Sequence, residues 1–141
     1  LPEWMKQKVA IIKQATDLHA NAFAQSLVSA YLSLDRLAPQ IALIRDAYQQ
    51  KCLRLSQLLT EELGEHLTFN QPEGGMFLWA TFREARDTTA WLQQTLATGV
   101  VYLPGEVFFS DNPDRRTLRF SYATATDEQL VEAVSRLKAA L

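Results

Sequence analysis

The sequence predicts an α+β domain in which long helices come first and a small mixed or antiparallel sheet backed by helices follows. The first observation is a change of hydrophobic period near Gly64, from helical spacing to the alternation of strands. The second is a glycine- and proline-containing turn at residues 71–75 between two short apolar runs, which is typical of a hairpin. The third is length, because 141 residues suffice to bury one core.

Three helices are expected before the sheet. The first begins after Pro2, and Asn21 or Asp17 can cap the second. The side of the second helix that we expect to be buried consists of Phe23, Leu27, Ala30, Tyr31 and Leu34. Pro39 is expected to begin the longest helix, and Gly64 to end it in the left-handed conformation.

Alternating and helical patterns divide the rest of the chain. Strands are expected at residues 66–70, 76–82, 100–103 and 117–124. Helices are expected at residues 88–98 and 128–141, with Asp87 and Thr126 as their N-caps. A segment rich in Asp, Asn and Pro, residues 106–116, is expected to be a loop.

The last predicted strand carries the candidate binding residue, Arg119. Side chains of a strand alternate between its faces, so Arg119 lies among small hydroxyl residues, opposite the apolar side formed by Leu118, Phe120 and Tyr122. A guanidinium fixed on a stiff element can bind a carboxylate through two parallel hydrogen bonds. The other interpretation is an ordinary surface arginine on the solvent face of an antiparallel strand.

Composition argues against several classes of function. The net charge of −2, with scattered basic residues, gives no nucleic-acid-binding surface. His19 and His66 are far apart and Cys52 is the only cysteine, so neither a metal site nor an internal disulfide is expected. A single cysteine, no signal peptide and no apolar run of about 20 residues together predict a cytoplasmic protein.

Four segments occur in an order and at a spacing that resemble a known family. Three of them are residues 72–79 (PEGGMFLW), 99–109 (GVVYLPGEVFF) and 118–123 (LRFSYA), which resemble the C-terminal part of the class I/II aminotransferases, the fold-type I enzymes that use pyridoxal phosphate. The fourth, residues 13–19 (KQATDLH), is similar to a segment of the aminoadipate, kynurenine and related multisubstrate aminotransferases. The resemblance covers essentially the whole chain.

The resemblance implies roles for particular residues. Arg119 would bind the α-carboxylate of the substrate, in agreement with the interpretation of its strand. Gly74 and Gly75 would belong to a turn that brings the small domain over the active site, where a backbone without Cβ atoms can approach a ligand closely. Pro104-Gly105 would lead a loop towards the substrate. His19 would lie either at the edge of the site or be a structural imidazole bonded to backbone.

The side chain of the amino-acid substrate is not specified by these motifs. Phe108, Phe109 and Tyr102 indicate either an apolar or aromatic substrate pocket or ordinary packing.

The resemblance also implies what this chain lacks. The family's lysine, which forms a Schiff base with pyridoxal phosphate, stands in a Ser-x-Ser-Lys type stretch that does not occur here. In the family order, that lysine and the phosphate-binding residues lie upstream of Leu1. Residues 1–35 are therefore expected to be connecting helices from a missing large domain, and residues 36–141 the C-terminal small domain.

The intact protein is expected to be a homodimeric aminotransferase that transfers an amino group between an amino acid and a 2-oxo acid, with the fragment alone inactive. One alternative is the aminotransferase-like effector domain of a bacterial winged-helix transcription regulator, in which the same residues could serve. Another is a free-standing α+β interaction module, in which Arg119 is only a surface residue.

Overall fold

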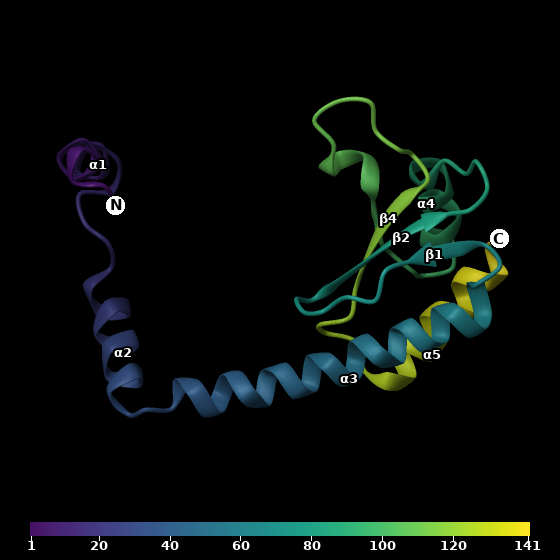
Figure 1. Cartoon of the computed structure of the whole chain (residues 1–141), viewed down its shortest axis with the longest axis horizontal. Helices are drawn as coiled ribbons and strands as arrows, with labels where there is room; N and C mark the ends of the chain where they lie inside the picture. Colours follow the sequence, from purple (N-terminus) through teal and green to yellow (C-terminus); the bar gives the residue numbers. More distant parts are fainter. The chain divides into compact units, whose positions relative to one another are not determined.

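The computed structural model describes residues 1–141, which form two compact units, Leu1–Ala42 and Leu43–Leu141 (Figure 1). The first unit contains α1 (Glu3–Asp17), α2 (Ala22–Ser33) and the beginning of α3 (Leu37–Leu63), which continues into the second unit. The domain division after residue 35 stays a prediction. No single helix has both the length and the hydropathy to cross a membrane, although α2 and α3 pass that test together as a bent pair.

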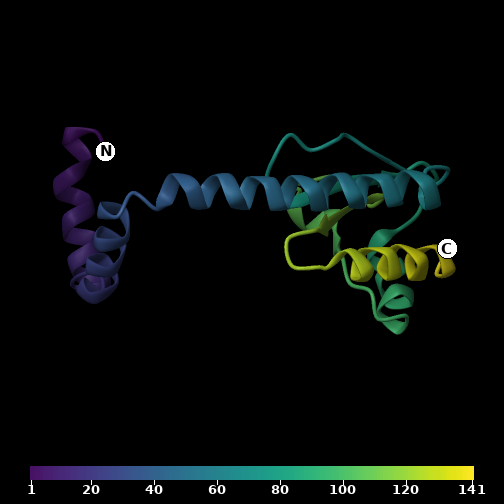
Figure 2. The same cartoon turned by 90° about the horizontal axis from the view of Figure 1, so that it is seen from below.

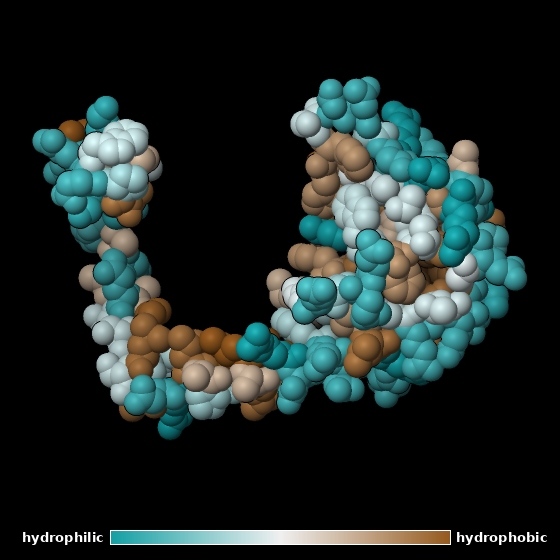
Figure 3. Space-filling view, in the orientation of Figure 1, coloured by the Kyte–Doolittle hydropathy of each residue, from teal (hydrophilic) through white to brown (hydrophobic).

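The helices of the first unit bury none of their residues. The Asn21 cap of α2 is confirmed, since its side chain accepts a hydrogen bond of 3.0 Å from the Ala24 N–H. The expected burial is wrong for this chain, because Phe23 is 73% exposed and Leu27 56% exposed. Apolar periodicity shows which face of a helix requires cover, but nothing in this unit supplies the cover. Figure 3 shows exposed hydrophobic residues, drawn in brown, at the surface of α2 and of the start of α3.

The second unit is built on a four-stranded antiparallel sheet of order β1-β2-β4-β3. Its elements are β1 (Leu67–Phe69), β2 (Phe77–Phe82), α4 (Thr88–Ala97), β3 (Leu103–Pro104), η1 (Gly105–Phe108), β4 (Thr117–Ser121) and α5 (Asp127–Ala139). The α+β class is therefore confirmed, and the sheet is antiparallel rather than mixed. The two central strands, β2 and β4, hold the residues discussed below.

Helices cover one face of this sheet and leave the other partly open. α3 and α5 run side by side (Figures 1 and 2), joined by ion pairs of Arg54 with Asp127 and of Lys138 with Glu62. The core lies between the helices and the inner residues of the strands, and includes Leu59, Leu63, Leu78, Ala80, Phe82, Trp91, Leu118, Tyr122, Val134 and Leu137. Burial of such side chains contributes roughly 1.5–3 kcal/mol each.

The expected N-caps of the last two helices are confirmed. The Asp87 carboxylate accepts hydrogen bonds from the N–H groups of Thr89 and Ala90 at the start of α4. Thr126 and Gln129 form a capping box at the start of α5. Each cap satisfies backbone donors that have no partner within the helix.

Three expectations about element ends are wrong. α3 begins at Leu37, so Pro39 lies within its first turn. Gly64 is not left-handed; a glycine suits this position instead because a Cβ would collide with the Thr60 carbonyl oxygen. The strand expected at residues 100–103 is reduced to Leu103–Pro104, because the Val100 N–H donates to the Thr95 carbonyl at the end of α4 instead of to a neighbouring strand.

Candidate functional site: a partnerless arginine among aromatic rings

Arg119 lies at the middle of β4, opposite Trp79 of β2 and Leu103 of β3. The predicted alternation is confirmed for the apolar side, since Leu118 and Phe120 are buried in the core. Thr117 departs from it: its side chain is buried and its hydroxyl donates to the Asp114 carbonyl at 2.6 Å. Arg119 is therefore held on the open face of a strand whose other face is fixed by the core.

The Arg119 side chain makes no hydrogen bond or ion pair within the chain, although it is partly buried. The other arginines that are without a hydrogen-bond or ion-pair partner, Arg36 and Arg45, are exposed. The remaining arginines bind carboxylates or carbonyl oxygens: Arg54, Arg83, Arg86, Arg115, Arg116 and Arg136. The N–H donors of Arg119 are therefore free of protein acceptors, and a guanidinium in this state can bind an anion.

Aromatic rings surround the guanidinium. Its central carbon lies 3.9 Å from the ring centroid of Phe77 and 4.5 Å from that of Phe108. Trp79 contacts Phe108 edge to face, with centroids 5.6 Å apart, and Phe109 with centroids 6.3 Å apart. The rings attract the cation through their π-electrons and offer no acceptor oxygen.

Phe108 belongs to η1, which is tied to the start of α4. The Thr89 hydroxyl donates to the Glu106 carboxylate at 2.5 Å, and Arg115 contacts Glu106 at 3.5 Å and Asp87 at 3.0 Å. The pKa of Asp87 lies below its usual value, mainly because its carboxylate accepts a hydrogen bond from the Ala90 N–H. Partial burial opposes this shift, and the neighbouring Arg115 adds to it. These contacts fix the segment that brings Phe108 to Arg119.

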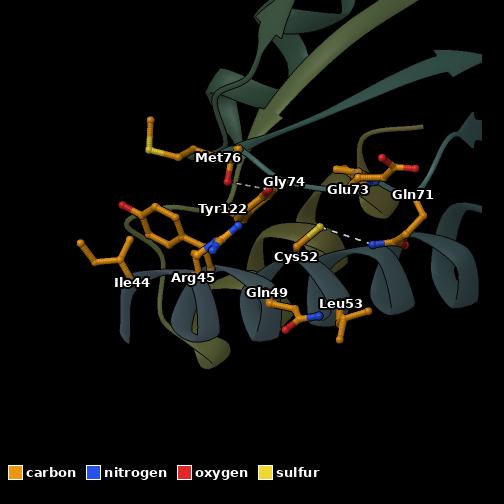
Figure 4. A pocket seen from close by; sticks show the side chains of 13 residues that line it. Ile44, Arg45, Gln49, Cys52, Leu53, Gln71, Glu73, Gly74, Met76 and Tyr122 are labelled. Carbon is orange, nitrogen blue, oxygen red and sulfur yellow. Dashed lines mark hydrogen bonds between the residues drawn. The ribbon is translucent and has the colours of Figure 1, made fainter. Parts of the chain in front are cut away.

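Gly74 and Gly75 lie in the turn before β2. Gly75 has φ +87°, a conformation that favours glycine, whereas a Cβ on Gly74 would meet no atom within 4 Å. The turn borders a cavity of about 660 Å³ (Figure 4), whose lining also includes Tyr48, Cys52, Gln71, Met76 and Tyr122. Arg119 does not line this cavity, so the structure does not bring the three predicted site residues together in one pocket.

Two hydrogen bonds fix this turn to the rest of the second unit. The Tyr122 hydroxyl donates to the Gly75 carbonyl at 3.0 Å, and Gln71 Nε2 donates to Cys52 Sγ at 3.4 Å, the contact drawn in Figure 4. Burial and, to a lesser extent, Cys52 raise the pKa of Tyr122 to about 12. Tyr122 therefore keeps its proton at neutral pH and remains a donor to the turn, while Cys52 is buried.

The lysines of this chain do not fit the attachment point of pyridoxal phosphate. All lie on helices, where Lys6, Lys13 and Lys138 bind carboxylates. Lys51 is partly buried and donates to the Ala123 carbonyl at 2.9 Å. The residues present suit the carboxylate of a substrate rather than the cofactor itself.

The aromatic candidates separate into two kinds. Tyr102 is a core residue: it is 3% exposed, its hydroxyl donates to the Thr88 carbonyl, and burial raises its pKa. Tyr102 therefore agrees with the packing alternative, whereas Phe108 and Phe109 lie exposed beside Trp79. His19 Nδ1 lies 2.9 Å from the Ala20 carbonyl oxygen, in agreement with the structural alternative.

The sequence did not reveal Phe77 and Trp79 as neighbours of Arg119. Both belong to an apolar run that was assigned to a strand without separating its two faces. The signal was present, because antiparallel pairing of this run with the Arg119 strand places alternate residues, Phe77 and Trp79, on the side of the arginine. The position of Phe108, by contrast, depends on where the short helix η1 packs, which strand pairing does not determine.

Comparison with known proteins identifies the family. The model of the family "Aminotransferase class I and II" matches residues 4–137. Aromatic-amino-acid aminotransferase 1 of Thermococcus litoralis is 34% identical over 131 residues, which is 93% of this chain and 31% of that protein. An HTH-type transcriptional regulator of Bacillus subtilis, YisV, is 25% identical over 125 residues, which is 89% of this chain and 25% of that protein.

Solved structures agree with this comparison. The α-aminoadipate aminotransferase of Thermus thermophilus, in complex with N-(5'-phosphopyridoxyl)-L-leucine, has a TM-score of 0.90 at 31% identity and is matched over 100% of this chain and 36% of its own. The kynurenine aminotransferase of Pyrococcus horikoshii has a TM-score of 0.91 at 30% identity, over 98% of this chain and 34% of its own. The expected resemblance to this subgroup is confirmed.

This chain spans about a third of the length of the three aminotransferases described above, between 31% and 36%. The match runs through both of its units and includes the strand of Arg119. The chain belongs to the class I and II aminotransferases, a family of enzymes that use pyridoxal phosphate.

Proposed function

We propose that this chain is the C-terminal part of a pyridoxal-phosphate-dependent aminotransferase and binds the α-carboxylate of the substrate through Arg119. The observation that carries the proposal is the free guanidinium, partly buried among aromatic rings and without any acceptor in the chain. The intact protein would transfer an amino group between an amino acid and a 2-oxo acid. It would act as a cytoplasmic homodimer, with the cofactor held by residues outside this chain.

In this proposal Arg119 orients the substrate without taking part in proton transfer. Two of its N–H donors bind the two carboxylate oxygens, which fixes the direction of the Cα atom that they carry. The apolar rings of Phe77, Trp79 and Phe108 would limit the access of water to the contact and so strengthen the attraction between the charges. The chemistry of the transfer belongs to pyridoxal phosphate, which acts as an electron sink.

The test is amino-group transfer by the intact protein loaded with pyridoxal phosphate. With L-phenylalanine, L-leucine or L-2-aminoadipate as donor and 2-oxoglutarate as acceptor, we expect glutamate to form. The likeness to YisV supports a second candidate, an effector domain of a transcription regulator. No transfer from any donor, together with binding of the intact protein to DNA upstream of its own gene, would favour the regulator.

The Gly74–Gly75 turn is proposed to approach the bound substrate through its backbone. Replacing Gly74 by alanine is expected to leave the free energy of unfolding within about 0.5 kcal/mol of the wild type, because the added methyl group meets no atom of this chain. In the intact protein the same change should lower kcat/KM by about tenfold, since the methyl group lies on the surface that meets the ligand. Glu73→Ala, at an exposed neighbouring position, is the control. Wild-type kinetics for Gly74→Ala would contradict the role of the turn.

A further inference from the structure

We infer that Phe77 and Phe108 are positioning residues, which hold the Arg119 guanidinium ready for a carboxylate before the substrate arrives. The inference rests on the proposed function, because it assigns these rings a role in the same contact. Both rings lie close to the guanidinium carbon, at 3.9 Å and 4.5 Å between that carbon and the ring centroids. No other polar contact of the chain orients the Arg119 side chain.

An arginine without such contacts would lose rotational freedom when it binds a ligand. Immobilising a long side chain opposes binding, and a guanidinium that is already held loses less freedom for each hydrogen bond it forms. The ring faces attract the cation but accept no conventional hydrogen bond, so the N–H donors remain available for the substrate. An acidic partner would orient Arg119 equally well, but it would compete with the substrate carboxylate for the same donors.

The two rings are themselves held by separate parts of the fold. Phe108 ends η1, which Glu106 ties to Thr89 and Arg115. Phe77 begins β2, directly after the turn whose Gly75 carbonyl accepts a hydrogen bond from Tyr122. The glycine turn and Arg119, which do not share a cavity, are thus connected through the ring of Phe77.

Phe77 and Phe108 are more exposed to solvent than is usual for large apolar side chains. Phe77 is 41% exposed and Phe108 48% exposed, so neither contributes mainly to the core of the domain. Phe109 provides a matched comparison, because it is 40% exposed and contacts Trp79 but makes no cation–π contact with an arginine. Leucine at any of these three positions keeps the apolar character and removes the π-face.

The test compares two probes that differ in charge and have nearly the same shape, 3-phenylpropionate and 3-phenylpropanamide. Their dissociation constants are measured by calorimetry on the intact protein loaded with pyridoxal phosphate, and the ratio of the amide constant to the carboxylate constant gives the carboxylate preference. Phe77→Leu and Phe108→Leu should each reduce this preference about three- to thirty-fold, as the loss of a cation–π contact implies. Phe109→Leu should leave it unchanged, and Phe108→Tyr, which keeps a π-face, should retain it.

The outcomes separate the inference from the proposed function. A wild-type protein without carboxylate preference, or an Arg119→Ala variant that keeps it, would overturn the proposed function. Loss of the preference in Arg119→Ala but not in Phe77→Leu or Phe108→Leu would overturn the positioning role alone. The positioning role would also be overturned if Phe109→Leu weakened the carboxylate preference as much as Phe77→Leu and Phe108→Leu do, because a general loss of packing would then explain the effect. Thermal midpoints of all variants distinguish such a loss from a change at the arginine.

Discussion

Replacing Arg119 by alanine in the intact protein is expected to lower kcat/KM for the amino-acid substrate by about two orders of magnitude or more and to raise KM. The substitution removes a charge-assisted contact with two hydrogen bonds, and such contacts are among the strongest polar interactions in proteins. The measurement is steady-state kinetics with the best amino donor at saturating 2-oxo acid. Stability should change little, because the side chain makes no hydrogen bond or ion pair within the chain.

Arg119→Lys separates charge from geometry. Lysine keeps the positive charge but lacks the planar fork, so we expect it to recover only part of the lost kcat/KM. Arg83→Ala, which removes an exposed arginine that donates to the Gly64 carbonyl, is the control for a general loss of positive charge. Unchanged kinetics for Arg119→Ala would remove Arg119 from the site.

Replacing Gly105 by alanine should destabilise the second unit by about 3 kcal/mol, at the upper end of the usual cost of overpacking. An added Cβ would lie 2.6 Å from the Thr117 Cβ and 2.9 Å from the Thr117 carbonyl carbon, both closer than atoms can approach. Thr117 is buried in β4 and cannot move aside without disturbing the sheet. Chemical denaturation of the intact protein or of a soluble domain measures the effect.

The clash at Gly105 also has a consequence for the site. Gly105 begins η1, so its displacement from β4 should move Phe108 away from Arg119 and reduce the carboxylate preference as well as the stability. Gly74→Ala is the matched glycine substitution, because it adds the same methyl group where no atom lies within 4 Å. Equal stability of the two variants would mean that the close approach of Gly105 to Thr117 is not maintained in solution.

Local signals allowed much of the fold to be predicted from the sequence. Asp87 and Thr126 are N-caps because their side chains bind backbone groups within three residues, a relation that the sequence shows directly. The alternation of Leu118, Arg119 and Phe120 likewise needs only the geometry of a strand. These features depend on neighbours in sequence, so a single chain suffices to recognise them.

Features that depend on distant residues were not predictable in the same way. Periodicity assigned a buried face to α2, but burial requires an element that packs against it, and α2 buries none of its residues. The aromatic surroundings of Arg119 combine Phe77 of the neighbouring strand β2 with Phe108 of η1, which is 31 residues after Phe77 in the sequence. The resemblance to aminotransferases pointed to the arginine, but the residues that hold it in place became visible only in the structure.

A crystal structure of the intact protein with pyridoxal phosphate and a bound amino-acid analogue tests the role of Arg119 most directly. We expect two nitrogen atoms of Arg119 to lie about 2.7–2.9 Å from the two oxygens of the α-carboxylate. Phe77 and Phe108 should remain in contact with the guanidinium, as they are without the ligand. An α-carboxylate bound by other residues, with Arg119 still free or paired with an acidic side chain of the rest of the protein, would contradict the proposal.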